Sequence, residues 1–347
     1  MKFGLAFDKR DEKSMAIARE ITKILKDSKQ DVVLESKVPG FQWKTKIASI
    51  RSMNVDIVIL IGDSFNVLRT FKELDRMKVL VLSVTTSSTN FFSEITADQF
   101  PKALEKIQNG DYTVEEYSRL EAKADGAESS IALNDVVITA GKSATIMSYE
   151  VIIDGKLIFR DAGDGVIIST PIGSTGYSSS AGGPVVFSNA KVFIVTPISS
   201  LNQNKPFVVR DSSDVLIKSI QCPTGVEVVT DGRFRAKLKG EEVLVNNADA
   251  PAEFIRFKEF SKNVFDKLKK RMPENGNLPQ SAPPSAKFLF KILQYEGALT
   301  QKELIQMSAM PSRTVRSGLS YLLKSGIIEE QRALRDARYS VYYIKSS

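Results

Sequence analysis

The segment from Asp161 to Pro184 reads DAGDGVIISTPIGSTGYSSSAGGP. Its apolar run at 166–168 predicts a short buried strand, and the residues after it are almost all Gly, Ser, Thr or Pro. Small side chains let a ligand approach the backbone closely, and the hydroxyl groups offer hydrogen-bond donors and acceptors. Tyr177 is the single aromatic residue of the segment, placed where a ring can cover a base. The composition alone is also typical of an ordinary turn region, so the order of the residues has to decide.

That order resembles the long signature of the NAD kinase family. The matching positions are Asp164-Gly165, Ser169-Thr170-Pro171, Gly173-Ser174-Thr175, Tyr177-Ser178 and Ala181-Gly182-Gly183-Pro184. Ile172 stands where the family usually has Thr, and Gly176 stands where it usually has Ala. The resemblance implies an NAD-binding segment whose contact residues are Asp164, Thr170, Ser174, Thr175, Gly176, Tyr177 and Ser178.

Length and composition narrow the class of protein. A chain of 347 residues with 42% hydrophobic residues predicts two or three domains with cores of their own. Cys222 is the single cysteine and histidine is absent, which excludes disulfide frameworks, zinc sites and mechanisms that use imidazole. We therefore expect no metal site built from the protein alone. No stretch has the length and apolar character of a signal peptide or membrane span, so we expect a cytoplasmic protein without membrane contact.

The first 110 residues alternate between predicted strands and helices. Their apolar pattern predicts strands at 2–7, 31–34, 55–61 and 79–84, and helices at 14–26, 45–53 and 100–108. This alternation is typical of an open, Rossmann-like α/β sheet, in which ligands bind beyond the carboxyl ends of the strands. The residues that follow the buried strand at 55–61 are therefore the first place to look for a site.

The chain reads Gly62-Asp63-Ser64-Phe65 at that point. The NAD kinase family has Gly-Gly-Asp-Gly-Thr there, a loop that cradles nucleotide phosphates and whose Asp is thought to take the proton from the ribose 2′-hydroxyl. The resemblance implies that Gly62, Asp63 and Ser64 form the phosphate loop and that Asp63 is the catalytic base. Ile61, Ser64 and Phe65 replace two glycines and the threonine, and their side chains narrow the room for phosphate oxygens. A helix N-cap is the alternative role of Asp63.

A second family landmark, Ala-Leu-Asn-Glu, stands here as Ala132-Leu133-Asn134-Asp135. In relatives the Asn contacts the dinucleotide near the adenine and the acid contacts a ribose hydroxyl, so the resemblance implies these roles for Asn134 and Asp135. Asp in place of Glu shortens the reach of the carboxylate by one methylene. Taken without the resemblance, Asn-Asp before a strand is more often a turn.

From about residue 130 to residue 245 the pattern changes to short strands joined by turns. Asp154-Gly155 and Asp231-Gly232 each lie between two apolar runs, which is the strongest local sign of a β-hairpin. This stretch resembles the all-β second domain of NAD kinases, including a Thr196-Pro197-Ile198 motif that here lacks the usual following His. A helix at 252–271 is predicted to return to the first domain. Relatives form homo-oligomers in which the region of Tyr177 meets a neighbouring subunit, so the resemblance implies a dimer or tetramer.

The stretch at 273–285, PENGNLPQSAPPS, has four prolines among polar residues and predicts a semi-rigid linker. Behind it we predict helices at 287–295, 300–308 and 313–325, then strands at 327–331 and 339–344. A capping box of Thr300 and Glu303 opens the second helix, and Ser312 is predicted to cap the third. This order resembles a winged helix domain of the kind common in archaeal and bacterial regulators.

The stretch at 286–347 carries ten Lys or Arg and five Asp or Glu, so +5 of the chain's net charge of +7 lies there. Basic residues on a third helix and on the turn between two strands suit major-groove insertion and phosphate contacts. The predicted DNA-binding residues are Arg313, Arg316, Ser320, Lys324, Arg335 and Arg338. The alternative interpretations are a solvated helix face and a domain that dimerises without DNA.

The predicted domains are an α/β domain at 1–125, a β-rich NAD-binding domain at 126–272, a linker at 273–285 and a winged helix domain at 286–347. In the first of two hypotheses, the protein is an NAD kinase that converts NAD to NADP with ATP or another phosphate donor, and Mg²⁺ bridges the phosphates. In the alternative, a weak or inactive kinase homologue binds NAD or NADP and thereby controls DNA binding. The altered phosphate loop favours the alternative, whereas the retained Asp63 favours the kinase.

Overall fold

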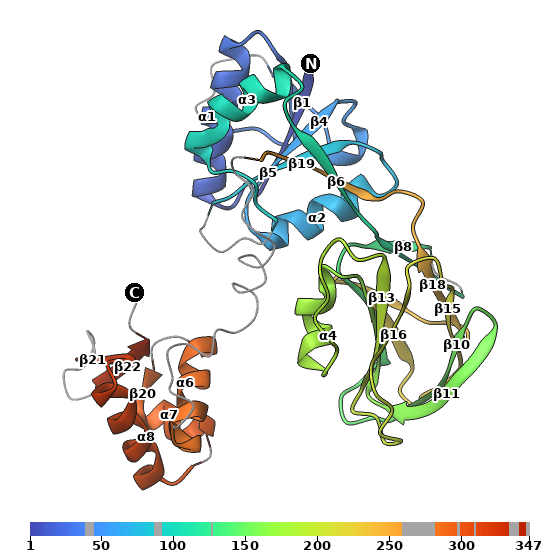
Figure 1. Cartoon of the computed structure of the whole chain (residues 1–347), viewed down its shortest axis with the longest axis vertical. Coiled ribbons are helices and arrows are strands. Elements are labelled where there is room, and N and C mark those ends of the chain that lie inside the picture. Colours follow the sequence, from blue (N-terminus) through green and yellow to red (C-terminus); the bar gives the residue numbers. More distant parts are fainter. Residues whose placement is uncertain are drawn as a thin grey trace. The chain divides into compact units, whose positions relative to one another are not determined.

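The computed structural model describes residues 1–38, 45–86, 92–125, 128–258, 282–296, 299–308, 310–332 and 340–344. The chain divides into two compact units, Met1–Met272 and Pro273–Ser347. Each unit is described by itself below. Within the first unit, a first lobe built on one sheet is followed by a sandwich of two sheets (Figure 1).

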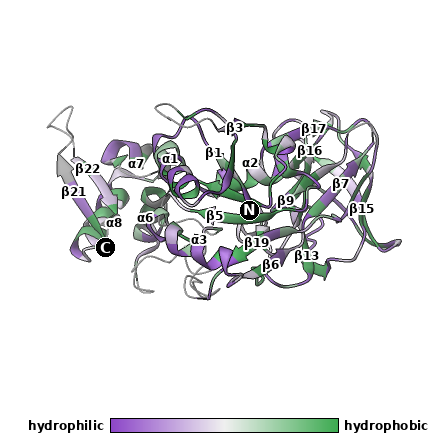
Figure 2. Cartoon of the chain, turned by 90° about the horizontal axis from the view of Figure 1, so that it is seen from above, coloured by the Kyte–Doolittle hydropathy of each residue, from purple (hydrophilic) through white to green (hydrophobic). Residues whose placement is uncertain are grey.

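The first lobe is built on a seven-stranded sheet whose strand order is β3-β2-β1-β4-β5-β19-β6. Strands β1, β2, β4 and β5 run parallel, and β6 pairs antiparallel with β19 at the edge. All five residues of β4 are buried, as the continuous apolar run predicts for a strand covered on both faces. Hydrophobic residues follow the strands β5 and β19 (Figure 2). The bounds are β1 (Lys2–Phe7), β2 (Asp31–Leu34), β3 (Lys46–Ile47), β4 (Ile57–Ile61), β5 (Leu80–Val84), β6 (Thr113–Tyr117) and β19 (Ala252–Arg256).

Helices cover both faces of this sheet. Helices α1 (Glu12–Asp27) and α3 (Phe100–Gln108) bury their apolar stripes on one face, and α2 (Ser64–Leu74) packs on the other face beside a short 3₁₀ helix, η1 (Ile50–Ser52) (Figure 1). The carboxyl end of β4 leads through two residues into α2. The sheet therefore places the start of α2 at the edge where ligands of such sheets bind.

Two six-stranded sheets form the β-sandwich, with strand orders β11-β10-β15-β18-β7-β8 and β14-β13-β12-β9-β16-β17. Their inner faces share one core of buried aliphatic side chains. The first sheet contains β7 (Leu120–Ala124), β8 (Ser130–Ala132), β10 (Met147–Ile153), β11 (Lys156–Gly163), β15 (Val215–Gln221) and β18 (Val243–Asn247). The second contains β9 (Asp135–Ala140), β12 (Gly165–Ser169), β13 (Val192–Ile198), β14 (Phe207–Arg210), β16 (Val226–Thr230) and β17 (Phe234–Lys237).

Both predicted Asp-Gly hairpins form. Asp154 and Gly155 join β10 to β11 with φ of 49° and 77°, and Asp231, Gly232 and Arg233 join β16 to β17, the first two with φ of 51° and 70°. These left-handed conformations are those of a tight hairpin turn, in which Asp and Gly are favoured. The Asp-Gly dipeptide was sufficient to predict these hairpins, because the conformation of a tight turn depends mainly on the backbone preferences of its own residues.

Two predicted helices of the first unit are wrong. Residues 46–47 form the edge strand β3, and only Ile50–Ser52 turn as a short 3₁₀ helix within the stretch predicted at 45–53. Ala252–Arg256 is strand β19, which inserts between β5 and β6 of the first sheet, and residues 259–271 of that predicted helix lie outside the described residues. The backbone groups offered by two neighbouring strands outweigh the helix propensity of a stretch such as Ala-Glu-Phe.

Arg119 lies where the chain crosses from β6 to β7, and only 1% of its surface is exposed. Its Nη1 donates to the carbonyl oxygen of Asp75 at 2.6 Å, and its Nη2 donates to that of Phe71 at 2.8 Å. Nη1 also lies 3.5 Å from the carbonyl oxygen of Ala250, on the returning chain. Burial lowers the pKa of Arg119 to about 10. The guanidinium thus ties the carboxyl end of α2, where the helix dipole is negative, to both crossing segments.

The described residues of the second unit form three helices, α6 (Pro284–Glu296), α7 (Gln301–Ser308) and α8 (Ser312–Lys324), and a three-stranded sheet in the order β20-β22-β21. The strands are β20 (Leu299–Thr300), β21 (Ile328–Arg332) and β22 (Ser340–Ile344). The predicted capping box is confirmed, because the backbone N–H of Thr300 donates to Glu303 at 2.7 Å and that of Glu303 donates back to the Thr300 hydroxyl at 3.3 Å. Pro311 is the N-cap of α8, so the predicted cap at Ser312 is wrong by one residue.

Among the described residues, no helix has both the length and the apolar composition that crossing a membrane requires.

We predict that Arg119→Met lowers the free energy of unfolding by about 2–4 kcal/mol, because methionine fills the space but removes the guanidinium donors from the carbonyl oxygens of Asp75 and Ala250 and leaves that of Phe71 with the N–H of Asp75 alone. Urea denaturation of the full chain measures this. Arg160→Met, at an arginine whose side chain is 70% exposed, is the matched control and is expected to change stability by less than about 0.5 kcal/mol. Equal effects of the two substitutions would contradict the role given to Arg119.

Candidate functional site

The loop between β4 and α2 carries Gly62 and Asp63. Asp63 is the N-cap of α2, and its Oδ1 accepts a hydrogen bond from the backbone N–H of Asn66 at 3.0 Å. Its Oδ2 accepts no hydrogen bond from the described part of the chain. Gly62 has φ of +144°, and a Cβ there would lie 2.4 Å from Nδ2 of Asn66. The N-cap role of Asp63 is therefore observed, and it leaves one carboxylate oxygen of an exposed side chain available for chemistry.

The loop that carries Asn134 and Asp135 is held by a buried carboxylate, Asp231, at the β16–β17 turn. Asp231 accepts hydrogen bonds from the backbone N–H groups of Leu133, Asn134 and Asp135 at 3.0, 2.7 and 3.3 Å. Its own N–H donates to the carbonyl oxygen of Asp135 at 2.9 Å. Burial raises the pKa of Asp231, and the three N–H donors act in the opposite direction. The hairpin turn thus fixes the backbone that presents Asn134.

The segment at 170–173 braces the same loop from the other side. The Thr170 hydroxyl donates to the carbonyl oxygen of Leu133 at 2.7 Å, and its backbone N–H donates to that of Asn134 at 2.9 Å. At Gly173 a Cβ would lie 2.0 Å from the Asn134 carbonyl oxygen, so only glycine permits this approach. The two family motifs are therefore in direct backbone contact.

Three hydroxyls that the sequence assigned to NAD contact are used inside the protein. Those of Thr170, Ser174 and Ser178 are fully buried, and they bond to Leu133, to Pro171 and to Thr196, respectively. They shape the loop in this structure, and a direct contact with NAD stays a prediction for them. Thr175 is half-buried in the short 3₁₀ helix η3 (Gly173–Thr175).

A cavity of about 670 Å³ gathers four of the predicted residues: Asn134, Asp135, Gly176 and Tyr177. Asp231 and Gly232 form part of its wall. The side-chain oxygen Oδ1 of Asn134 is buried and has no hydrogen-bond partner in the described structure. Buried acceptors are normally hydrogen-bonded, so a donor group on a ligand would complete this one. Tyr177, at the start of α4 (Tyr177–Ser180), is 48% exposed and offers its ring. The cavity therefore suits a flat polar group such as a nucleobase.

Asp164 does not line this cavity. It is exposed at the junction of β11 and β12, and its carbonyl oxygen accepts from the Thr139 hydroxyl at 2.9 Å. Asp63 and Ser64 also lie outside the cavity lining. The structure thus brings the Asn134 loop and the residues 176–177 together, and it leaves the phosphate loop as a separate part of the candidate site.

The phosphate loop meets the β16–β17 hairpin through Phe65 and Arg233. The guanidinium of Arg233 lies over the ring of Phe65, with its Cζ 2.8 Å from the ring centroid. Phe65 is two residues from Asp63, and Arg233 is two residues from Asp231. This contact therefore joins the predicted catalytic loop to the turn that organises the nucleotide cavity.

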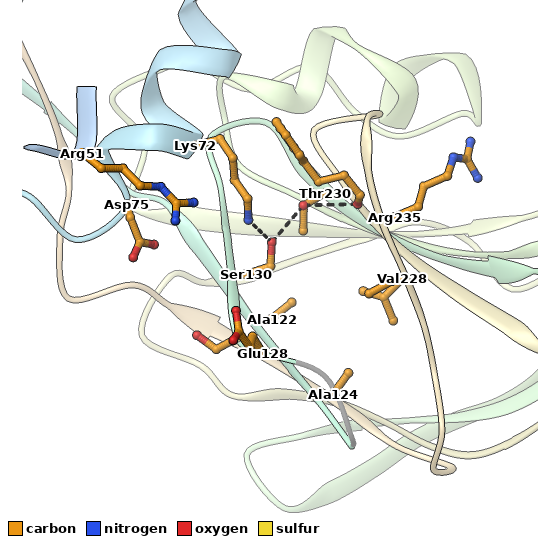
Figure 3. Close-up of a pocket in the computed structure, with 13 residues that line it drawn as sticks. Arg51, Lys72, Asp75, Ala122, Ala124, Glu128, Ser130, Val228, Thr230 and Arg235 are labelled. Atoms are coloured by element: carbon orange, nitrogen blue, oxygen red, sulfur yellow. Dashed lines mark hydrogen bonds between the residues drawn. The ribbon is translucent and has the colours of Figure 1, made fainter. Parts of the chain in front are cut away.

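A second cavity, of about 420 Å³, lies at the junction of α2 and the open end of the sandwich (Figure 3). Lys72 of α2 points into it and donates to the Ser130 hydroxyl, which bonds to that of Thr230 at 3.0 Å. The Lys72 ammonium lies 5.2 Å from the centroid of the Phe234 ring. Burial lowers the pKa of Lys72. Because residues alternate along a strand, Val229 of β16 faces the first cavity and Thr230 faces the second.

In the second unit, α8 presents the four predicted residues Arg313, Arg316, Ser320 and Lys324 to solvent. Its opposite face is buried through Val315, Gly318, Leu319 and Leu322. Arg335 and Arg338 lie outside the described residues.

The sequence missed the roles of Asp231, Arg233 and Arg119. The Asp-Gly turn signalled a hairpin, but a carboxylate that accepts from a loop almost a hundred residues away leaves no local sign. Arg233 and Arg119 had no signal beyond being isolated basic residues.

An α/β lobe with an acid after a central strand, followed by a β-sandwich whose cavity gathers Asn134 and Tyr177, is the arrangement of a nucleotide-binding protein. Residues 3–112 match the ATP-NAD kinase N-terminal domain family, and residues 133–257 match the ATP-NAD kinase C-terminal domain family. The two matches together cover more than half of the chain. The chain belongs to the NAD kinase family.

Similar proteins agree with this assignment. The NAD kinase of Thermococcus gammatolerans is 30% identical over 265 residues, which are 74% of this chain and 94% of that protein. A bifunctional NADP phosphatase/NAD kinase of Methanococcus maripaludis is 31% identical over 278 residues, and this chain spans about half (48%) of its length. The structure of an NAD kinase from Archaeoglobus fulgidus in complex with ATP has a TM-score of 0.63 and 24% identity, and covers 78% of this chain and 99% of its own. That likeness shows the fold.

We predict that Asp231→Asn lowers the free energy of unfolding by about 1–3 kcal/mol and speeds amide exchange at residues 133–135, since an amide group cannot accept from all three N–H donors. Hydrogen exchange read by mass spectrometry, with urea denaturation, measures both effects. The matched control is Asp154→Asn at the other Asp-Gly turn, where the carboxylate accepts one backbone N–H, of Asp214, at an exposed position. Unchanged exchange at 133–135 in Asp231→Asn would count against the anchoring role.

Proposed function

We propose that the protein is an NAD kinase that transfers the γ-phosphoryl group of ATP, or of another phosphate donor, to the adenosine 2′-hydroxyl of NAD. The observation that carries this proposal is the cavity lined by Asn134, Asp135, Gly176 and Tyr177, at which the Oδ1 of Asn134 is buried and has no hydrogen-bond partner among the described residues. Membership of the family supports it, as do the names of relatives that are NAD kinases over most of their length. The predicted cytoplasmic location belongs to the same proposal.

In the proposed reaction, the 2′-oxygen of NAD attacks the γ-phosphorus, a new O–P bond forms, and the bond from phosphorus to the bridging oxygen breaks to release ADP. The proton of the hydroxyl passes to the free Oδ2 of Asp63, while Oδ1 is held by the N–H of Asn66. Asn134 and Asp135 orient the adenosine half of NAD, and Asp231 holds both residues in place. Positioning of this kind supplies most of the catalysis in phosphoryl transfer.

Mg²⁺ is proposed to arrive with the nucleotide. Mg²⁺ in such sites is bound mainly by phosphate oxygens and water, and among the described residues no three Asp, Glu, Cys or His side chains gather into a site that would hold the ion without the nucleotide. When bound, the ion neutralises phosphate charge.

We predict that the purified protein forms NADP from NAD, Mg²⁺ and ATP or polyphosphate, and that Asp63→Asn lowers kcat by about 100-fold or more. Asparagine caps a helix as well as aspartate does, so this variant is expected to keep the stability of the parent protein. An enzyme-coupled NADP assay measures kcat, and calorimetry measures the affinity for NAD, which is expected to stay within about threefold.

Two outcomes would contradict the proposal. Full turnover in Asp63→Asn would show that Asp63 is not the catalytic base. No turnover by the parent protein, with NAD still bound, would favour the alternative hypothesis of a homologue that binds NAD or NADP without catalysis.

We also propose a homo-oligomer, a dimer or tetramer. Edge strand β11 exposes Leu157 and Ile158, and edge strand β14 exposes Val208. The two edges lie close together, because the rings of Phe159 and Phe207 are 5.8 Å apart. Exposed apolar side chains on neighbouring sheet edges favour burial against a second copy.

A second candidate function concerns the unit at 273–347, which we propose to be a winged helix domain that binds double-stranded DNA. The order α6, α7, α8 and then β21 and β22, with β20 added to the sheet, supports this proposal. The observation that favours DNA is the outward face of α8, where Arg313, Arg316 and Lys324 lie on one side of a helix whose other side is buried. In the alternative hypothesis, NAD or NADP bound to the first unit controls this binding.

We predict that the full chain binds a random-sequence DNA duplex at low salt, and that the double variant R316A/K324A weakens binding about tenfold and flattens the salt dependence, because up to two phosphate contacts are lost. Fluorescence anisotropy over a salt series measures both quantities. Lys302→Ala, at an exposed lysine on α7, is the control for loss of charge. Binding that falls equally in the control and the double variant would show a diffuse charge effect and no docking face on α8.

A further inference from the structure

The contact between Phe65 and Arg233 indicates a further role for the altered phosphate loop. This inference rests on the function proposed above. In this loop Ser64 stands where the family has glycine and Phe65 stands where it has the smaller threonine, so less room is left for phosphate oxygens. Loss of these small residues alone predicts a weaker hold on the phosphates. The ring of Phe65, however, carries the guanidinium of Arg233 on its face.

The position of Arg233 is set by its own turn. Asp231 is anchored by three backbone N–H donors, and Gly232 completes the turn with φ of 70°. Arg233 closes the turn, since its N–H donates to the carbonyl oxygen of Thr230 at 3.1 Å. The backbone of Arg233 is therefore as firmly placed as the Asn134 loop, and the ring of Phe65 fixes the far end of its side chain.

A guanidinium that lies on an aromatic face keeps its N–H groups at its edges, where they can make the paired hydrogen bonds that phosphate oxygens accept. Within the described residues, no carboxylate forms an ion pair with Arg233, whereas Arg160 and Arg235, two other exposed arginines of the β-sandwich, each pair with a glutamate at 2.7 Å. Asp63, two residues before Phe65 in the sequence, also forms no ion pair with Arg233, and its Oδ1 accepts the N–H of Asn66. Beside Arg233, the start of α2 adds the positive end of an eleven-residue helix.

We propose that Arg233, held on the ring of Phe65, binds phosphate oxygens of the phosphoryl donor and takes over contacts that the altered loop has lost. In this arrangement Phe65 is a positioning residue, because it acts through the arginine and does not touch the donor. The loop has then exchanged backbone contacts for a side chain supplied by the β-sandwich. Donor binding would thereby connect the first lobe with the hairpin that holds the NAD cavity.

Calorimetry with a non-hydrolysable ATP analogue and Mg²⁺ tests this without any need for turnover. Four variants of the full chain are compared: Arg233→Ala, Phe65→Leu, the two combined, and Arg160→Ala as a control for loss of an exposed arginine in the same unit. Arg233→Ala is expected to weaken analogue binding roughly 10- to 100-fold, as for loss of hydrogen bonds to a charged group. Phe65→Leu is expected to weaken it less, and the double variant no further than Arg233→Ala, because both changes remove one interaction.

Arg233→Lys and Phe65→Tyr sharpen the result. Lysine keeps the charge but loses the planar fork, so Arg233→Lys is expected to retain only part of the affinity for the ATP analogue. Tyrosine keeps the ring, so Phe65→Tyr is expected to retain all of it. The affinity for NAD, measured in the same way, is expected to change by less than about threefold in each variant, which separates donor binding from a general disturbance of the site.

Unchanged analogue binding in Arg233→Ala would overturn the inference, and a fall in melting temperature with unchanged binding would do so equally, since the contact would then merely join the two lobes. Additive losses in the double variant would overturn the positioning role of Phe65. These outcomes are distinct from failure of the kinase proposal. A protein that binds the analogue through Arg233 but forms no NADP would uphold the inference and remove the proposed catalysis.

Discussion

A buried carboxylate in a hairpin turn, Asp231, is the constraint on which the site depends. It is 6% exposed, and burial raises its pKa, a cost that the N–H groups of Leu133, Asn134 and Asp135 offset in part. The charge of the buried Arg119 acts in the same direction as these donors. A loop held in this way has little freedom to move, so the buried side-chain oxygen of Asn134 can stay without a hydrogen-bond partner among the described residues.

Helix α2 connects this anchor to the rest of the molecule. Asp63 caps its start and Phe65 lies under Arg233, while its last turn sends Lys72 into the second cavity and is bound by Arg119. The junction between the first lobe and the sandwich is consequently rich in charge-assisted hydrogen bonds as well as apolar packing. Such contacts depend on direction, and they fix how far the start of α2 lies from the Asn134 loop more sharply than apolar contacts alone can.

The 170–173 segment and the phosphate loop differ in what they keep of the family's motifs. The 170–173 segment keeps the close backbone approach of Gly173 to Asn134, a contact that any side chain would destroy. The phosphate loop has changed at the positions now occupied by Ser64 and Phe65, next to a hairpin that supplies a guanidinium. A backbone contact between two loops has no substitute, whereas a positive charge for phosphate can come from any nearby element. That difference explains why Gly173 is kept, whereas Ser64 and Phe65 replace the smaller residues of the family's loop.

By itself the sequence determined the α/β rhythm of the first lobe, the Asp-Gly hairpins, the capping box of Thr300 and Glu303, and the residues Asn134, Asp135, Gly176 and Tyr177 that line one cavity. These follow from apolar periodicity, from tight turns, or from motifs written along one segment. Tertiary structure alone decided that Ala252–Arg256 is a strand, because only the folded sheet offers the place between β5 and β6. It also decided that the hydroxyls of Ser174 and Ser178 turn inward and that Asp231, Arg119 and Arg233 serve the site. The hydrogen-bond or contact partner of each of these side chains is a backbone carbonyl group or a residue distant in the chain. The local order of residues does not indicate such partners.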